Sequence, residues 1–137
     1  MDEVKYSFQH PADFQELYNL YEELGWNKLK LSKEDLEKMC RQSWFVVYAY
    51  YEDKLIATGR IISDGVITGL ICGVGVHPNY QSKGIGKSII ELLVEKCKEE
   101  GIIAQLMCND SLEKYYEKFG FERFSIGMSK NTRAINS

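Results

Sequence analysis

Two glycines at the point where a predicted loop becomes a helix, Gly84 and Gly86, give the sequence its clearest chemical signal. Glycine weakens a helix by about 1 kcal/mol relative to alanine, so its presence in a first turn requires a reason. The unpaired backbone N–H groups of a helix start bind phosphate, and glycine keeps side chains out of the way. Lys83 and Lys87 add positive charge, and no acid occupies this turn. The segment predicts a phosphate-binding site, although it also suits a glycine-rich turn with solvated lysines.

Three further glycines, Gly69, Gly73 and Gly75, fall inside the strand predicted just before this loop. Glycine in a strand interior often marks a bulge or a place where another group approaches the backbone closely. Two interpretations therefore stay open, a ligand lying against this strand or close packing of a neighbouring helix.

Two common nucleotide signatures do not match this region. Gly86-Lys87-Ser88 resembles the end of a Walker A loop, but Gln81 stands where the first glycine is required. The dinucleotide fingerprint G-x-G-x-x-G fails because its third glycine falls on Pro78 or on Ile89, depending on the starting glycine. A phosphate ligand of another kind is therefore expected.

The composition excludes several classes of protein. The chain has 137 residues, with 17 basic and 20 acidic residues and a net charge of -3, so we expect no general binding of nucleic acid. Its longest apolar run, residues 44–51, is far shorter than the roughly 20 residues of a membrane span. No secretory signal pattern opens the sequence, and we expect a cytoplasmic protein. The four cysteines form no CxxC pair, so we expect buried thiols and no metal site.

The elements that must position these residues follow from periodicity and turn signals. We expect six strands, at residues 4–8, 44–51, 55–62, 69–76, 102–108 and 121–128. A first helix is expected to begin at residues 10–13, with Pro11 in its first turn, and to end at Gly25. A second should begin at Ser32, which forms a capping-box pattern with Asp35.

Two more helices complete the pattern. One extends from Ile85 to about Gly101, and a short one opens with a capping-box pattern of Asp110 and Glu113 and ends at Gly120. The short connections between residues 44 and 76 favour antiparallel pairing, and the strand–helix–strand unit that follows favours a parallel crossover. The predicted fold class is α/β (α+β), a mixed, mostly antiparallel central sheet flanked by helices. We expect one domain over residues 1–130 and a polar tail over residues 131–137.

The stretch from Val74 to Lys87 resembles the acetyl-CoA signature of the GCN5-related N-acetyltransferase (GNAT) family. That signature is Gln/Arg-x-x-Gly-x-Gly/Ala after a strand that ends in Val-x-Pro. The run from Tyr115 to Phe121 resembles the second motif of the family, an aromatic-Tyr-Glu-Lys-x-Gly-Phe run. Because both motifs occur in the expected order, with a helix and a strand between them, the resemblance covers most of the chain. It implies the acyl-CoA N-acyltransferase (GNAT) fold.

The resemblance also implies where acetyl-CoA would bind. The pantetheine arm would pair with the backbone of Val74, Gly75 and Val76. The pyrophosphate would rest on the loop and helix start formed by Gln81, Ser82, Lys83, Gly84, Ile85, Gly86 and Lys87. Asn109 stands where some members hold CoA, but it also suits a simple helix-start residue.

Tyr116 matches the general acid of the family. A free thiol has a pKa of about 8.5 and a phenol of about 10, so a positioned tyrosine can protonate the departing CoA thiolate; a core aromatic is the alternative. The base is not readable, because Gly73 stands where some relatives carry an acid, which leaves Asp64 or a chain of waters. The acceptor side would include Trp26 and Asn27, although Trp26 also suits ordinary packing.

We therefore predict an N-acetyltransferase that moves an acetyl group from acetyl-CoA to a primary amine of a small molecule or peptide. Direct attack in a ternary complex is expected, with no metal. Two alternatives stay open, namely a non-catalytic acyl-CoA-binding or regulatory module and a protein-interaction domain whose glycines are structural. The resemblance is also compatible with a homodimer, because small members of the family often pair.

Overall fold

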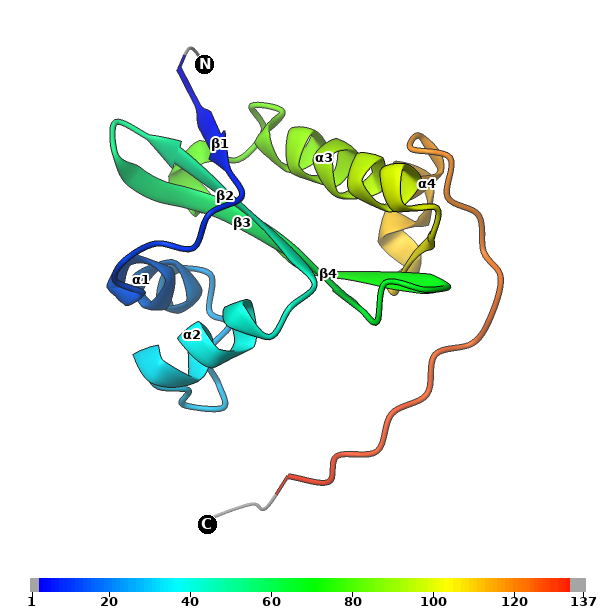
Figure 1. The fold of residues 1–137 in the computed structure, drawn as a ribbon, viewed down its shortest axis with the longest axis horizontal. Helices are drawn as coiled ribbons and strands as arrows, with labels where there is room; N and C mark the ends of the chain where they lie inside the picture. The colour runs from blue at the N-terminus through cyan, green and yellow to red at the C-terminus, as the bar shows by residue number, and fades with distance from the viewer. Residues whose placement is uncertain (1–2, 134–137) are drawn as a thin grey trace. The chain divides into compact units, whose positions relative to one another are not determined.

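A five-stranded mixed sheet organises the first of two compact units, residues 1–106 and 107–137, in a computed structural model that describes residues 3–133. Its strands are β1 (Lys5–Ser7), β2 (Phe45–Tyr51), β3 (Lys54–Ser63), β4 (Thr68–Val76) and β5 (Ile103–Leu106). Their order in the sheet follows the chain, as Figure 1 shows for β1 to β4. Neighbours are antiparallel except β4 and β5, which are parallel. The predicted meander and the predicted crossover are both confirmed.

The β2–β3 hairpin shows why these strands form. β2 consists of aromatic, valine and alanine residues, which favour a pleated and buried surface. Its turn residues Glu52 and Asp53 have φ angles of +48° and +64°, the left-handed pair that matches the twist of a tight hairpin. This hairpin places β3, and through it β4, in the middle of the sheet.

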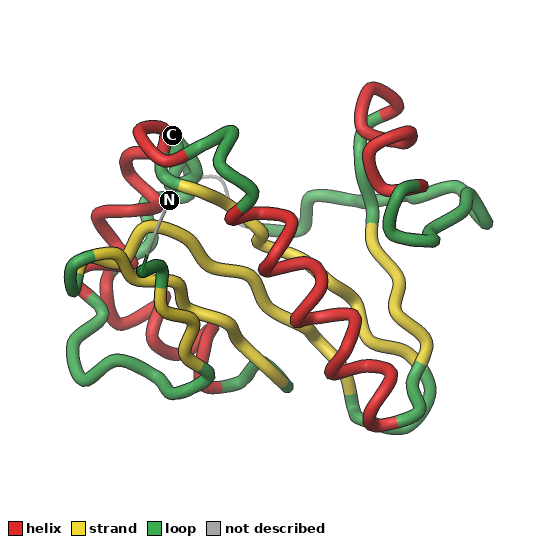
Figure 2. Tube along the Cα trace, turned by 90° about the horizontal axis from the view of Figure 1, so that it is seen from above, coloured by secondary structure: helices red, strands yellow, loops and turns green. Residues whose placement is uncertain are grey.

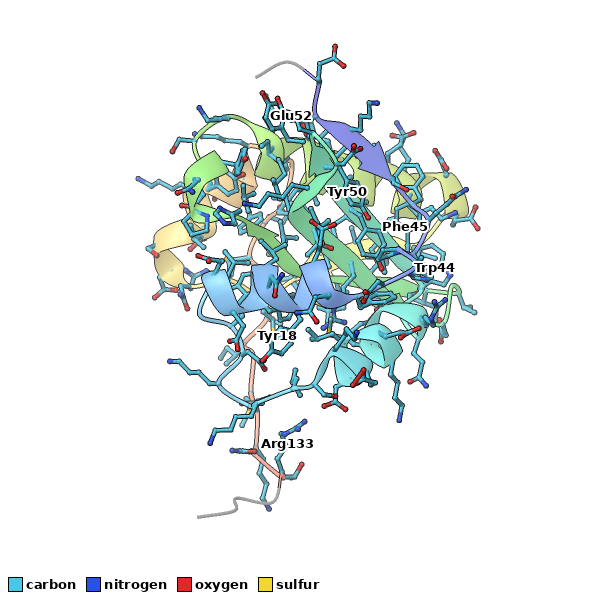
Figure 3. All side chains as sticks on the ribbon, turned by 90° about the vertical axis from the view of Figure 1, so that its left-hand side faces the viewer. Tyr18, Trp44, Phe45, Tyr50, Glu52 and Arg133 are labelled. Carbon is cyan, nitrogen blue, oxygen red and sulfur yellow. The ribbon has the colours of Figure 1, made fainter. Side chains whose placement is uncertain are left out.

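One face of the sheet is covered by α1 (Gln15–Glu23) and α2 (Lys33–Arg41) (Figure 1). The core of this face includes Phe14, Leu17 and Tyr48, which are almost fully buried. Tyr18 and Tyr50, labelled in Figure 3, pack against the same cluster.

The capping box predicted for α2 is confirmed. The Ser32 hydroxyl accepts the backbone N–H of Asp35 at 3.0 Å, and the Asp35 carboxylate accepts the N–H of Ser32 at 2.9 Å. The predicted start of α1 is wrong, because that helix begins at Gln15 and not at Pro11. Asp13 accepts the Gln15 N–H at 3.0 Å and so forms a local turn ahead of the helix.

The opposite face of the sheet is covered by α3 (Ile85–Glu100), which lies across the strands in Figure 2. Gly59 of β3 permits this close packing, because a Cβ there would lie only 2.7 Å from Ile89 Cγ2. The predicted end of the helix is confirmed, with Gly101 as a left-handed C-cap at a φ of +69°.

The second unit is described over residues 107–133 and contains α4 (Glu113–Glu117), preceded by one 3-10 turn, Asp110–Leu112. The predicted strand at 121–128 is wrong, because this segment has no regular secondary structure. Ile126 is 85% exposed and Met128 92% exposed, so the alternating apolar residues of this segment are not buried. The predicted capping box of Asp110 and Glu113 is also wrong, because Glu113 bonds the Arg123 guanidinium instead.

Three further observations concern the predicted classes of site. Within residues 3–133, no helix is long and apolar enough to cross a membrane. The same residues contain no group of three His, Cys, Asp or Glu side chains that could hold a metal ion. All four cysteines are free, and Cys40 and Cys97 are buried as predicted, whereas Cys108 is exposed.

Residues 134–137 of the predicted tail lie outside the described part of the chain. The predicted single domain over residues 1–130 stays a prediction.

Candidate functional site

A β-bulge bends β4 in the middle of the sheet. Thr58 of β3 pairs with Gly75, and two residues further along β3 Arg60 pairs with Cys72. The stretch of β4 between these pairs is therefore one residue longer than the stretch of β3. Gly73 lies in this bulge with a φ of +63°, a conformation that glycine adopts without steric cost. The predicted strand glycines thus mark both a bulge and close packing.

The second half of β4 extends beyond β5. The β4–β5 ladder starts where Thr68 pairs with Ile103 and stops where Ile71 pairs with Leu106, the last residue of β5. The predicted binding segment Val74–Val76 lies beyond this point, in the part of β4 that β5 does not pair.

The peptide groups at the end of β4 have defined directions. The His77 N–H donates to the carbonyl oxygen of Ile56 on β3 at 2.7 Å. Because peptide groups alternate along a strand, those of Val76 face the opposite edge. The Gln81 side chain reaches this edge, where its Nε2 donates to the Val76 carbonyl oxygen at 2.9 Å. The predicted strand and loop residues are therefore joined directly.

The connection from β4 to α3 consists of a short helical turn followed by a sharp bend. A one-turn 3-10 helix, Pro78–Tyr80, is capped by His77, whose Nδ1 accepts the N–H of Asn79 at 3.1 Å. Ser82 and Gly84 then adopt left-handed conformations, with φ angles of +64° and +83°. These angles turn the chain abruptly into α3.

The start of α3 presents backbone donors and no acid. Its first helical hydrogen bond runs from the Ser88 N–H to the Gly84 carbonyl oxygen at 3.1 Å. The N–H groups of residues 85–87 therefore have no partner within the helix. Lys83 and Lys87 are exposed, and the first turn has no acidic side chain. This arrangement can bind an anionic ligand, phosphate above all.

Ile85 differs from its neighbours in this turn. Its side chain is 3% exposed and belongs to the core, whereas Gln81, Ser82 and Gly84 are exposed. The predicted residues therefore divide into one buried anchor and a solvent-facing loop.

Tyr116 lies on α4 in the second unit, where it is half-buried among aromatic rings. Its ring centroid is 5.1 Å from that of Tyr115 and 6.1 Å from that of Phe121. Burial raises the pKa of Tyr116, and Tyr115 and Cys108 raise it further. The phenol is therefore protonated at neutral pH.

Asn109 is exposed at the start of the 3-10 turn, and its side chain caps nothing there. The predicted roles of Asn109 and Tyr116 stay predictions, since each belongs to a unit separate from the glycine loop.

The structure assigns local roles to three residues that the sequence left open. Asp64 is exposed in the β3–β4 turn and accepts the Val66 N–H at 2.9 Å. Asn27 makes two hydrogen bonds with the backbone of Leu31, at 3.0 and 2.7 Å, and so shapes the α1–α2 loop. Trp26 packs over β4, where its ring leaves no room for a Cβ on Gly75.

Arg60, which no sequence motif indicated, lies on β3 opposite Cys72 and close to Gly73. The signal for it was a charged residue within a predicted strand, Leu55–Ile62, that is otherwise apolar or neutral.

One family model matches most of the chain. The family model described as "Acetyltransferase (GNAT) family" matches residues 12–121, which include the β4 bulge, the glycine loop and Tyr116. The chain belongs to the GNAT acetyltransferase family. The predicted fold and family are thereby confirmed.

Curated GNAT relatives match most of this chain. A histone acetyltransferase of Glycine max is 26% identical over 89% of the chain and 57% of its own length. GCN5-related N-acetyltransferase 2, chloroplastic, of Arabidopsis thaliana is 26% identical over 89% of the chain and 55% of its own length. The chain thus spans a little over half the length of these two relatives.

Solved GNAT structures match almost the whole chain. A protein of meticillin-resistant Staphylococcus aureus, described as a "probable acetyltransferase", is 28% identical with a TM-score of 0.79, covering 94% of this chain and 99% of that one. Glucosamine-6-phosphate N-acetyltransferase of Arabidopsis thaliana has a TM-score of 0.76 at 22% identity, covering 96% of this chain and 100% of that one, which shows a shared fold.

Proposed function

We propose that this chain is an N-acetyltransferase that moves an acetyl group from acetyl-CoA to a primary amine of a small molecule or peptide. The observation that carries the proposal is the start of α3, which offers unpaired backbone N–H groups and exposed lysines and no acid. A helix start of this kind suits a pyrophosphate. Its position directly after the unpaired half of β4 suits a ligand that continues from phosphate into an amide-containing arm.

The residues present fit acetyl-CoA at both ends of this segment. Gly84 has open space, since an added Cβ would meet no atom within 4 Å, so the phosphate groups can approach the backbone. Val74–Val76 can pair with the pantetheine amides along the edge that β5 leaves free. Bound there, acetyl-CoA supplies an acetyl group activated as a thioester and a thiolate as leaving group.

Tyr116 is the proposed proton donor to the leaving sulfur. Its raised pKa keeps the proton on Oη at neutral pH, and a phenol in that state can protonate a thiolate, whose ordinary pKa is about 8.5. The amine must attack in its neutral form, and its ammonium loses a proton to water, because β4 has no carboxylate and Gly73 has no side chain. The proton that the nitrogen loses as the amide forms also goes to solvent, from which Tyr116 regains the proton that it gives to the sulfur. We propose direct attack by the neutral amine in a ternary complex, in the cytoplasm, whose reducing conditions suit the four free cysteines.

Two measurements test this proposal together. Acetyl-CoA should raise the Tm of the wild-type chain, because a ligand at a hundred times its Kd adds about 2.7 kcal/mol of stability. A screen of amines, including peptide N-termini and lysine side chains, should identify an acceptor that consumes acetyl-CoA. Protection from heat without consumption of acetyl-CoA by any amine would instead indicate a non-catalytic acyl-CoA-binding module. Absence of protection would favour an interaction domain with structural glycines.

A matched pair of charge reversals locates the site. Lys87 and Lys98 are both exposed on α3, one in the first turn and one in the last. Lys87→Glu, like Gly86→Glu, places a negative charge among the phosphate-binding N–H groups and should abolish protection by acetyl-CoA. Lys98→Glu makes the same change in charge at the far end of the helix and should retain protection. Equal protection in all three variants would show that α3 does not bind the phosphates.

A further inference from the structure

Arg60 is a cation in the middle of the sheet for which the described part of the chain supplies no counter-ion. It lies on β3 between β2 and β4, and its side chain is half-buried. Its Nε is buried without a hydrogen-bond partner. The ion pairs formed within residues 3–133 do not include it. A buried donor without a partner is rare in a native protein, where such a group usually bonds to ordered water or to a ligand.

The space beside this Nε is bounded by a second donor. A Cβ on Gly73 would lie 3.3 Å from Arg60 Nε and 3.6 Å from the Tyr21 hydroxyl oxygen. The Tyr21 hydroxyl donates to Met39 Sδ at 4.0 Å and accepts from the Arg60 guanidinium. Because Gly73 has no side chain, its bulge leaves the space beside Arg60 Nε open. Burial raises the pKa of Tyr21, which the adjacent guanidinium partly offsets, so the phenol retains its proton.

Arg60 lies on the face of the sheet opposite α3. It pairs with Val46 on β2, which belongs to the core cluster beneath α1 and α2. The ring of Trp26 contacts Tyr21 edge-on, with centroids 5.4 Å apart, and extends over Gly75. The guanidinium therefore lies beside Tyr21 of α1 and next to the bulge, on the other face of the sheet from α3, whose start we assign to the phosphates of acetyl-CoA.

We propose that Arg60 binds an anionic group of the acceptor, so that the substrates are amines that also carry a carboxylate or a phosphate. This inference rests on the proposed function and names its substrate class. A guanidinium matches both oxyanions through paired N–H donors, and a partly buried cation is favourable only when an anion completes it. The amine of such a substrate would project from the anchored end toward β4.

Matched acceptors provide the kinetic test. An α-amino acid and its amide differ only in the carboxylate, and an aminoalkyl phosphate and its amino alcohol differ only in the phosphate. The wild-type chain should have a lower KM for the anionic member of at least one pair. Arg60→Gln should raise that KM by about ten- to a hundredfold relative to the KM for the neutral member, as expected for loss of a charged hydrogen bond. An equal change for both members would overturn the inference.

An internal carboxylate provides a second test. Gly73→Asp places a carboxylate beside Arg60, in a left-handed conformation that Asp and Asn tolerate better than most residues. It should reduce the preference for the anionic acceptor more than the matched variant Gly73→Asn, which has the same shape without the charge. Equal preferences in the two variants would contradict an electrostatic role for Arg60.

A binding measurement keeps the inference separate from turnover. The Nε–H resonance of Arg60, assigned by its loss in Arg60→Lys, is followed in the wild-type full chain during titration with acetate, inorganic phosphate or neutral acetamide. A saturating shift with acetate or phosphate, and none with acetamide, supports the anion site and identifies the preferred oxyanion. Absence of a shift with both anions overturns it. If acetyl-CoA gives no protection from heat while the anion shift persists, the proposed function fails and the anion site stands.

Discussion

The candidate functional residues of the two units are held in place by different kinds of contact. In the first unit, the glycine loop leaves β4 and enters α3 at Ile85, and both elements belong to a core in which residues such as Leu93 are fully buried. In the second unit, the described residues include no buried hydrophobic side chain, and Tyr116 is held by aromatic contacts within its own segment.

This contrast separates stability from chemistry. The packed sheet holds the phosphate-binding loop in shape, because the left-handed φ angle of Ser82 is strained for a residue with a side chain and persists only where surrounding contacts support it. The segment around Tyr116 has little apolar burial to lose. Substitutions in the first unit should therefore change folding stability, and substitutions of the tyrosine should change turnover.

The largest effect is expected for Tyr116→Phe. Loss of the proton donor should lower kcat by about a hundredfold or more, while the Tm and the protection by acetyl-CoA stay close to those of the wild type. Because the pKa of Tyr116 is raised, the wild-type phenol holds its proton below that pKa and loses it above. The alkaline decline in kcat should thus begin above the ordinary phenol pKa of 10.0.

A pH series of kcat for the wild type and the variant checks this prediction. The step caused by ionisation of Tyr116 should be absent from the Tyr116→Phe profile. An unchanged kcat in the variant would show that the proton comes from another group. It would also contradict the assignment of turnover to Tyr116 in the second unit.

Two truncations test whether folding stability depends on the first unit more than on the second. Leu93→Ala removes a fully buried side chain between α3 and the sheet and should lower the free energy of unfolding by about 2–5 kcal/mol. Ile126→Ala removes a side chain that is 85% exposed in the second unit and should change it by less than about 0.5 kcal/mol. Urea denaturation of both variants measures the difference. A comparable loss for Ile126→Ala would mean that residue 126 is buried in solution.

The smallest effects concern polar contacts at the surface. Ser32→Ala breaks the capping box of α2 and should lower the free energy of unfolding by about 1 kcal/mol. Arg123→Ala breaks exposed contacts to Glu113 and Asp110 in the second unit and should leave the Tm unchanged, because solvent screens such pairs. Thermal denaturation compares them, and the reverse order of effects would contradict the assignment of folding stability to the first unit.

Local signals in the sequence predicted several elements correctly. The capping box at Ser32 involves atoms three residues apart, and the helix from Ile85 to Gly101 shows the expected periodicity and a glycine terminator. Both depend on interactions within a few residues, which the sequence displays directly.

Two of the wrong predictions share a physical cause, competition between partners, and the third has another. The Asp13 carboxylate accepts the Gln15 N–H and pairs with Lys33, so the helix begins later than the position of Pro11 predicted. Glu113 has a cationic neighbour in Arg123, which competes with the cap. The apolar alternation at residues 121–128 is typical of a strand, but a strand also needs a ladder partner, and alternation does not specify one.

The sequence by itself therefore determined the family, the mixed sheet and the loop whose backbone suits a phosphate, because glycine spacing and hydrophobic periodicity are local properties. Only the tertiary structure decided which residues meet on β4. The bulge at Gly73 and the position of Arg60, whose Nε has no partner, both depend on strand register. Register arises from packing between strands distant in the chain, and no single segment encodes it.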